Sequence, residues 1–446
     1  MKGDIYLSCY ADGKIVTEHR VSEFVPDHGK REFKLVNLYP EVSYQTIHGF
    51  GGAITESVGD TLNRMPQETA EAIINEYFGA DGMQYRFVRT HIDSCDFSLG
   101  NYAACEDQED EQFTCFSLER DEKYIIPWIK KAYKAAGCDF QVMLTPWSPP
   151  GFMKTNGEKN NGGSLKREYY QQWADYICRY IIEYKKRGVN VTMISVQNEP
   201  NAVQTWDSCI FTAEQEKTFL EKYLYPALVK SGLRDIRVHI WDHNKERLYE
   251  RVRDIIDQET AQMVAGACFH FYSGDHFESV RMVREKYPKL DLVFSEGCVE
   301  YSRFDSDDQM KHADKYTHDI IGNLCAGMNT FIDWNIVLNQ YGGPNHVGNY
   351  CAAPIICNTF NGTADQKLLY RYLWHFSHFI RPEAVRMAVS SFDTQVEVVA
   401  ARNSDGRIVV IIYNRSLEDG QVFVRMAAQQ LEVGVPVGAV CSVVIE

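Results

Sequence analysis

Two glutamates stand where a pair of carboxyl groups could perform acid–base and nucleophilic chemistry. Glu199 closes an apolar run at residues 191–199 and is followed by Pro200, which prevents simple continuation into a helix. Glu296 closes another apolar run at residues 291–296. Cleavage of a glycosidic bond needs one protonated group for the leaving oxygen and one ionised group at the anomeric carbon. A single glutamate after a strand is usually a surface charge, but two at matching positions are candidate catalytic residues.

Aromatic and polar side chains follow several other apolar runs. Taken singly, each aromatic of this kind is more often a lid over the core than a contact to a ligand. Gathered at one face, they would offer flat apolar surfaces and polar groups to a sugar ring. The residues that we single out on this ground are Arg89, Asp96, Trp147, Phe152, His270, Phe271, Tyr272 and Trp334.

Eight short apolar runs alternate with segments of helical periodicity. The runs are residues 46–55, 84–92, 140–147, 191–199, 236–243, 263–272, 291–296 and 326–334. They are rich in Val, Ile, Phe and Thr, as expected for parallel strands buried on both faces. The helical segments are residues 66–78, 122–136, 169–187, 213–231, 246–258, 276–286, 308–323 and 365–379. Eight strand–helix units predict an α/β fold of the (β/α)8 TIM-barrel type, whose active site lies at the carboxyl ends of the strands.

Both ends of the chain have a different pattern. Residues 1–45 and 383–446 contain short alternating runs separated by turn signals such as residues 11–13 and 418–420. This pattern is typical of antiparallel sheets. We therefore predict a catalytic barrel over residues 46–382, flanked by one antiparallel β-sandwich that both termini build. Two separate end caps are the alternative.

Composition and charge exclude several classes of protein. The chain has 446 residues, 45% hydrophobic and 24% charged, which is typical of a globular protein with a large core. Its net charge of −15 argues against nucleic acid or an anionic membrane surface as a partner. We find no run of the roughly 18 apolar residues that span a bilayer and no signal-peptide core. We expect a cytoplasmic protein, with secretion by another route as the alternative, and the oligomeric state stays open.

The cysteines and histidines give no metal-binding pattern. Cys95, Cys105 and Cys115 recur every ten residues, but no CxxC pair accompanies them, so we expect free thiols. Five histidines near strand ends likewise form no HxH pair or paired His–Asp cluster. We therefore expect neither a metal ion nor an organic cofactor. These histidines are His48, His91, His239, His243 and His270.

Seven motifs occur in order along the predicted barrel. They are HGFGGAITES (48–57), SCDFS (94–98), TPWSPPGFMKTNG (145–157), VQNEP (196–200), HFY (270–272), SEGC (295–298) and IDWNIVLNQYGGPNHVGN (332–349). Asn-Glu-Pro alone occurs in many barrel hydrolases, whereas the whole set is specific. The chain resembles glycoside hydrolase family 30, and within it the glucosylceramidase-like branch. The flanking β-sandwich fits the same family.

The resemblance implies roles for individual residues. Glu199 would be the acid/base and Glu296 the nucleophile of a retaining mechanism, and Asn198 would contact the sugar 2-hydroxyl. Tyr272 and Arg89 would hydrogen-bond the nucleophile. The charge of Arg89 should keep Glu296 ionised, and a dry setting beside that anion should raise the pKa of Glu199. The residues expected around the terminal sugar are Asp96, Trp147, Trp334 and Asn349, with His270 lining the same pocket.

Departures from the family pattern bear on specificity. Phe152 and His346 stand where mammalian-type glucosylceramidases carry Trp, which predicts a pocket mouth less suited to ceramide. Asp96 and Trp147 keep the pattern of enzymes that enclose one terminal sugar. The resemblance therefore favours release of a terminal β-glucosyl unit. A β-xylosyl unit is a close alternative, because xylose lacks only the hydroxymethyl group.

Two other hypotheses stay open at this point. An endo-acting β-1,6-glucanase or xylanase of the same family would have an open cleft in place of a pocket around Asp96 and Trp147. A noncatalytic carbohydrate-binding barrel would be indicated by loss of a catalytic carboxylate. Both Glu199 and Glu296 are present, which argues against the second hypothesis.

Overall fold

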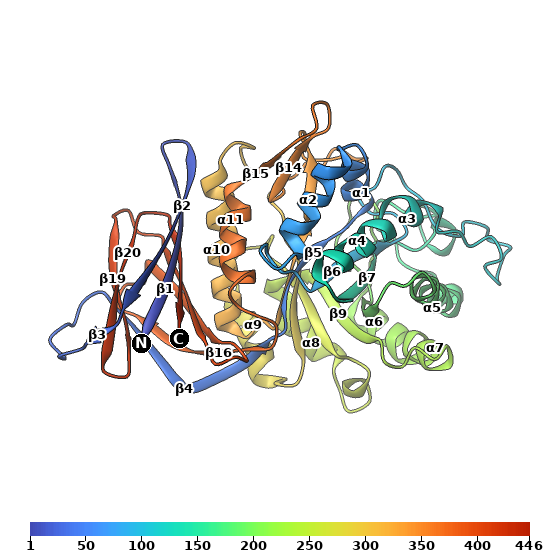
Figure 1. Ribbon diagram of the computed structural model, residues 1–446. Helices are drawn as coiled ribbons and strands as arrows, with labels where there is room; N and C mark the ends of the chain where they lie inside the picture. Colours follow the sequence, from blue (N-terminus) through green and yellow to red (C-terminus); the bar gives the residue numbers. More distant parts are fainter.

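A closed barrel of eight parallel strands forms the centre of the computed structural model, which describes residues 1–446 (Figure 1). The strands are β5 (Gly49–Ala53), β6 (Phe87–Ile92), β7 (Gln141–Pro146), β8 (Val191–Ser195), β9 (Arg237–Asn244), β10 (Gly266–His270), β11 (Asp291–Glu296) and β12 (Thr330–Asn335). Each predicted apolar run contains most or all of one strand. All residues of β6 and β12 are buried, which explains why these strands read as continuous apolar runs. The predicted (β/α)8 barrel is confirmed.

Helices cover the outside of the barrel, and each predicted helical segment contains most or all of at least one helix (Figure 1). They are α1 (Glu56–Asn63), α2 (Gln67–Phe78), α3 (Glu119–Tyr124), α4 (Ile126–Ala136), α5 (Tyr170–Lys186), α6 (Ala213–Phe219), α7 (Tyr225–Lys230), α8 (Leu248–Ile255), α9 (Phe277–Lys286), α10 (Gln309–Ala326) and α11 (Leu368–Ser377). A π-helical turn, Leu220–Leu224, joins α6 to α7. Thr212 and Gln215 form a capping box that begins α6. None of the helices combines the length and apolar composition needed to cross a membrane.

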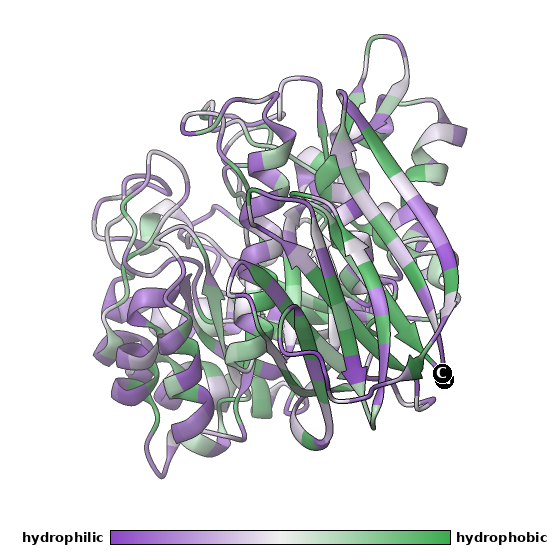
Figure 2. Cartoon of the chain, turned by 90° about the vertical axis from the view of Figure 1, so that its left-hand side faces the viewer, coloured by the Kyte–Doolittle hydropathy of each residue, from purple (hydrophilic) through white to green (hydrophobic).

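The two ends of the chain build one β-sandwich, as predicted. Its strands are β1 (Lys2–Ala11), β2 (Lys14–Glu23), β3 (Val25–Pro26), β4 (Leu35–Ile47), β16 (Ala384–Ser391), β17 (Val396–Arg402), β18 (Ile408–Asn414), β19 (Gly420–Met426), β20 (Gln429–Val435) and β21 (Val440–Ile445). They pair in the order β2-β1-β21-β18-β17-β16-β4-β19-β20-β3 around a core of 22 buried residues. Figure 2 shows hydrophobic and hydrophilic residues alternating along these strands. The pairing of β4 with β19 is parallel, unlike the other pairings of this sheet.

Helices α10 and α11 lie between the barrel and the sandwich (Figure 1). His375 of α11 is fully buried there, and its ring nitrogens lie 2.7 Å from Ser442 Oγ and 2.9 Å from Ser8 Oγ. The Tyr413 hydroxyl of the sandwich donates to Asp314 of α10 at 2.7 Å. The main hydrophobic core, of 97 residues, extends from the barrel into β18 and β21. The sandwich is therefore packed on the barrel through a shared core.

A small sheet that the sequence did not predict follows the last barrel strand. Its strands are β13 (Val337–Asn339), β14 (Ile355–Asn358) and β15 (Thr363–Gln366). They are too short to show a periodic pattern. The segment between β13 and β14 contains Asn349, and its Cys351 pairs with Glu300 after β11. This sheet thereby brings a second chain segment to the carboxyl end of the barrel.

Candidate active site

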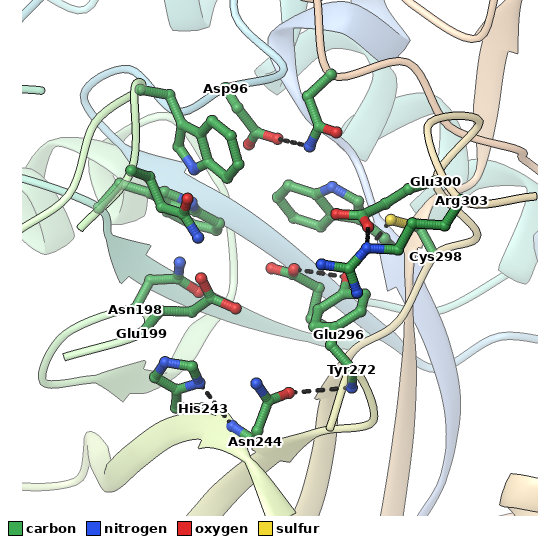
Figure 3. Close-up of a pocket in the computed structure, with 15 residues that line it drawn as sticks. Asp96, Asn198, Glu199, His243, Asn244, Tyr272, Glu296, Cys298, Glu300 and Arg303 are labelled. Atoms are coloured by element: carbon green, nitrogen blue, oxygen red, sulfur yellow. Dashed lines mark hydrogen bonds and ion pairs between the residues drawn. The ribbon is translucent and has the colours of Figure 1, made fainter. Parts of the chain in front are cut away.

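A cavity of about 160 Å³ opens at the carboxyl end of the barrel (Figure 3). Pockets for drug-sized ligands usually measure about 300 to 1,000 Å³, so this cavity is small. The predicted site residues that line it are Asp96, Trp147, Asn198, Glu199, Tyr272, Glu296, Trp334 and Asn349. The other lining residues are Gln204, Trp206, His243, Asn244, Cys298, Glu300 and Arg303.

The ends of β8 and β11, which β9 and β10 separate in the barrel, position the two glutamates. Glu296 is the last residue of β11, and Glu199 lies in a bend just after β8. The Glu199 N–H donates to the Asp242 carbonyl at 2.9 Å, and the Asn198 N–H donates to the Pro146 carbonyl at 2.9 Å. Glu199 has a φ of 45°, in the left-handed region. Strain of this kind persists where surrounding contacts hold a functional residue in place, as they do here.

Two donors hold the carboxylate of Glu296. Arg89 Nη1 donates to Oε2 at 2.6 Å, and the Tyr272 hydroxyl donates to Oε1 at 2.9 Å. Arg89 Nη2 also donates to Asn198 Oδ1 at 2.8 Å and to Asp242 Oδ2 at 3.0 Å. Because Arg89 is fully buried, its charge acts with little screening by solvent. The structure thus places Arg89 and Tyr272 on Glu296, where the sequence analysis expected them.

Glu199 and His270 lie within hydrogen-bond distance of each other. His270 Nδ1 lies 3.2 Å from Glu199 Oε1, and His270 Nε2 lies 3.1 Å from Asp242 Oδ1. Burial raises the pKa of Asp242, but the charge of Arg89 and the contact with His270 hold it below its usual range. Asp242 is therefore ionised and accepts the Nε2 proton. One proton remains between Nδ1 and Oε1, giving either an imidazolium beside a carboxylate or a neutral imidazole beside a protonated Glu199.

The protonation of the two glutamates differs from the expectation drawn from the sequence. Burial raises the pKa of Glu296, and the charges of His270 and Arg89 offset this only in part. Burial also raises the pKa of Glu199, but the charges of His243 and His270 outweigh it and lower that pKa to about 2. Burial lowers the pKa of His270, but acidic neighbours, Glu296 foremost, raise it to about 9. The proton between the two side chains therefore lies on His270. The sequence analysis predicted a raised pKa for Glu199 because it did not include the positive charge of His270.

Aromatic rings and polar groups form the inner wall of the cavity. Trp147 and Trp334 are stacked, with ring centroids 5.3 Å apart. Asn349 Nδ2 donates to Asp96 Oδ2 at 3.4 Å. Burial and the charge of Glu296 raise the pKa of Asp96 well above its usual range, so this carboxyl group can donate as well as accept. The wall is suited to a ring that carries hydroxyl groups.

Three residues lie elsewhere than the sequence analysis expected. His270 is fully buried behind Glu199 and is not part of the cavity wall. Phe152 packs on Tyr169 with ring centroids 5.6 Å apart, and His346 turns its Nδ1 toward two backbone carbonyls. Neither of these two side chains lines the cavity. Position in a motif gave the right strand end or loop for each residue but not the direction of its side chain.

Several residues of the site were missed. Asp242 and Asn244 belong to the end of the fifth strand, and His243 there was weighed only as a metal ligand. The rule that selected the two glutamates applies to this strand end as well, so it could have identified Asp242. Gln204, Trp206, Glu300 and Arg303 lie on loops beyond strand ends, where no periodic pattern marks them.

The spacing of the two carboxyl groups defines the class of enzyme. One carboxylate oxygen of Glu199 lies within 4.8 Å of one carboxylate oxygen of Glu296. Retaining glycosidases place these groups about 5 to 5.5 Å apart, whereas inverting enzymes need about 6.5 to 9.5 Å to admit a water molecule. A (β/α)8 barrel with this pair at its carboxyl end is a retaining glycoside hydrolase.

Comparisons with known proteins give the family. The chain belongs to glycosyl hydrolase family 30: the model of its TIM-barrel domain matches residues 47–380, and that of its beta sandwich domain matches residues 383–443. Lysosomal acid glucosylceramidase of Mus musculus is 32% identical, over 86% of this chain and 78% of its own length. The crystal structure of SrfJ from Salmonella typhimurium has a TM-score of 0.96 at 37% identity, covering 100% and 99% of the two chains. A solved endo-beta1,6-glucanase has a TM-score of 0.87 at 25% identity, with 99% of each chain covered.

Proposed function

We propose that the enzyme releases a single terminal β-glucosyl unit from a glycoside, with retention of configuration. The observation that carries this proposal is the small cavity, with Asp96, Asn349 and Trp147 at its inner wall. A volume of about 160 Å³ favours one sugar ring beside the catalytic pair over a longer chain of sugars. The similarity to a protein named glucosylceramidase supports glucose as that sugar.

In the first step, Glu199 takes the proton from His270 Nδ1 and passes it to the glycosidic oxygen. Glu296 attacks the anomeric carbon as the bond to this oxygen breaks, so the aglycone leaves as a neutral alcohol. Arg89 and Tyr272 keep the attacking carboxylate oriented. Because Arg89 already occupies the Oδ1 of Asn198, the Asn198 amide nitrogen is left to donate to the 2-hydroxyl of the sugar.

The second step reverses the proton movement. Glu199, now a carboxylate, takes a proton from water as the water oxygen attacks the anomeric carbon. The bond to Glu296 breaks, the β-sugar is released, and the proton returns to the Glu199–His270 pair. Two displacements at the same carbon restore the original configuration.

A panel of 4-nitrophenyl β-glycosides tests the sugar. We expect kcat/KM to be highest for the glucoside and about tenfold lower for the xyloside, because xylose lacks one group that the pocket can bind. The galactoside and fucoside should be poorer again. A higher kcat/KM for the xyloside than for the glucoside would mean that the terminal sugar is xylose and not glucose.

Action within a β-1,6-glucan is a second candidate, favoured by the structural similarity to an endo-beta1,6-glucanase over the whole chain. Reducing-end-labelled β-1,6-linked glucose oligosaccharides separate the two candidates. Terminal release shortens the labelled chain by one unit at a time. Early appearance of labelled products several units shorter would favour internal cleavage.

A further inference from the structure

The mouth of the cavity differs in character from its inner wall. Besides the buried Cys298, six of the lining residues were not predicted from the sequence. They are at least partly exposed and lie toward solvent: Gln204, Trp206, His243, Asn244, Glu300 and Arg303. Among them only Trp206 is apolar. The leaving group must extend past Glu199 toward solvent, so it passes these side chains.

We propose that Trp206 and the Glu300–Arg303 pair form a subsite for a second sugar, so that the natural aglycone is a polar, hydroxyl-rich unit and not a hydrocarbon chain. This inference rests on the proposed function. It assigns to this site the chemical class of the leaving group.

The charged pair is the first observation that supports this subsite. Arg303 Nε lies 2.8 Å from Glu300 Oε2, and the Arg303 side chain is 62% exposed. Figure 3 shows the Arg303 guanidinium reaching from the loop after β11 toward the cavity. Sugar hydroxyls can replace the water that these charges bind, whereas a hydrocarbon chain would strip it away without compensation.

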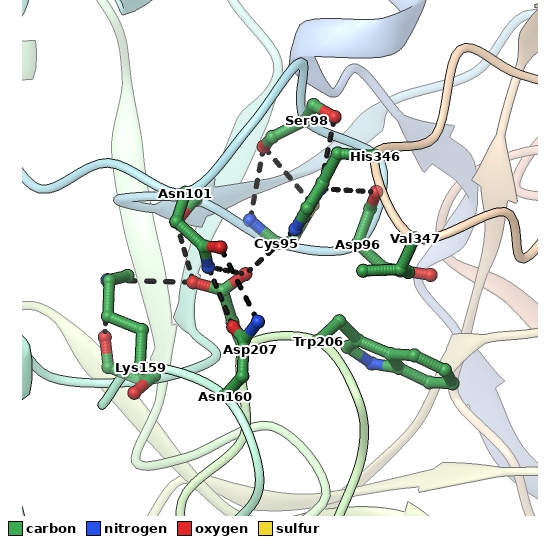
Figure 4. A network of polar contacts seen from close by, with 12 residues as sticks. Cys95, Asp96, Ser98, Asn101, Lys159, Asn160, Trp206, Asp207, His346 and Val347 are labelled. Carbon is green, nitrogen blue, oxygen red and sulfur yellow. Dashed lines mark hydrogen bonds and ion pairs between the residues drawn. The ribbon is translucent and has the colours of Figure 1, made fainter. Parts of the chain in front are cut away.

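The position of Trp206 is the second observation. Its neighbour Asp207 is buried and accepts hydrogen bonds from Ser94 Oγ at 2.6 Å and Asn101 Nδ2 at 3.0 Å. Lys159 Nζ lies 3.7 Å from the same carboxylate. Figure 4 shows the Trp206 indole extending away from Asp207, on the side where Asp96 lies. The indole also packs against the buried cluster that contains Trp147 and Trp334, so the ring is held in place before a ligand arrives, which reduces the entropy lost on binding.

Steady-state kinetics on three kinds of substrate tests the subsite. The substrates are the four β-linked glucose disaccharides, octyl β-glucoside and 4-nitrophenyl β-glucoside. We expect the wild-type kcat/KM for the best disaccharide to exceed that for octyl glucoside about tenfold. Trp206→Ala should lower kcat/KM about tenfold for this disaccharide and less than about threefold for octyl glucoside, because a rigid sugar ring can stack on the indole whereas a flexible octyl chain loses conformational entropy when it packs there.

Arg303→Ala should show the same selectivity for the disaccharide. Phe360→Ala and Arg179→Ala are the matched controls: Phe360 is 80% exposed, and Arg179 pairs with Glu183 on α5. Neither residue lines the cavity, and we expect wild-type kinetics from both.

The outcomes of these assays test the sugar subsite and the proposed hydrolysis of β-glucosides separately. Wild-type preference for octyl glucoside, or equal loss on both substrates in Trp206→Ala, would overturn the sugar subsite. If the wild type still hydrolyses 4-nitrophenyl glucoside, the proposed β-glucosidase activity is retained even when the subsite is rejected. Failure of the wild type on all three kinds of substrate would overturn the proposed function itself.

Discussion

His270 holds the catalytic proton, and Glu199 transfers it to the glycosidic oxygen. The imidazole lies between two carboxylates, with Asp242 fixing Nε2–H and leaving Nδ1 free to exchange its proton with Glu199. A glutamate with a pKa of about 2 would be a poor acid by itself. His270 beside it has a pKa of about 9, so near neutral pH it holds a proton that is one hydrogen bond away from Glu199.

Replacing His270 should change the dependence of kcat/KM on pH. In the wild type the shared proton is lost as pH rises through about 9, so kcat/KM should fall along that alkaline limb. In His270→Gln, Glu199 must hold the proton alone, and the alkaline limb should move down by at least about one pH unit. The measurement is kcat/KM for 4-nitrophenyl β-glucoside against pH, with exposed His19→Gln as control. An unchanged alkaline limb in His270→Gln would contradict the shared-proton account.

The catalytic pair could be predicted from the sequence, but its electrostatics could not. Glu199 and Glu296 each close a buried strand of a barrel, so the position of each along the chain already places it at the reactive end. The pKa of Glu199 depends on the contacts of His270 and on Asp242, which belong to other strands. Such contacts follow from side-chain direction, which apolar periodicity does not contain.

At the scale of elements, one buried carboxylate links the loop at residues 201–211, between β8 and α6, to the loops that follow two other strands. Asp207 receives hydrogen bonds from Ser94 and Asn101, which follow β6. Three strand ends are linked in this way, since Lys159 after β7 lies beside the same carboxylate. The loop has no helix or strand of its own over most of its length, so its conformation depends on these side-chain contacts and on backbone hydrogen bonds to the loop after β7.

Asp207→Ala should loosen this loop and destabilise the protein. Its removal deletes the carboxylate that accepts hydrogen bonds from Ser94 and Asn101 and that lies beside the Lys159 cation, which costs about 1 to 3 kcal/mol. We expect that loss in the free energy of unfolding, together with faster amide exchange over residues 201–211. Asp365→Ala, whose side chain is 66% exposed, is the control. Unchanged exchange in this loop would show that other contacts hold it.

The barrel elements were predictable because burial on both faces imposes a pattern on every strand. The small sheet β13–β15 was not, because three- and four-residue strands carry no period. The loops of the cavity mouth were not predicted either. Their positions depend on single polar contacts such as those of Asp207.

At the scale of the whole molecule, a neutral histidine lies where the barrel meets the sandwich. His375 contacts Ser8 from the N-terminal strands and Ser442 from the C-terminal strands, so both chain ends are tied to α11. Burial lowers the pKa of His375 to about 3. The unfolded chain would protonate this side chain near pH 6.5, while the folded protein keeps it neutral.

The unfolding free energy should therefore fall on acidification. Between pH 6.5 and about 3 the unfolded state binds the extra proton, and stability decreases as pH falls through that window. His375 alone contributes a loss of about 2 kcal/mol at pH 5. His375→Gln should reduce the difference between the unfolding free energies at pH 7 and pH 5, measured in urea. An equal difference in both proteins would contradict a neutral His375 in the folded state.

The stereochemistry of the first-formed product tests the central claim most directly. Proton NMR during hydrolysis of 4-nitrophenyl β-glucoside distinguishes the anomers before mutarotation mixes them. Because one carboxylate oxygen of Glu199 lies within 4.8 Å of one carboxylate oxygen of Glu296, the account predicts that β-glucose appears first. First appearance of α-glucose would mean a single displacement by water and would contradict the nucleophilic role of Glu296.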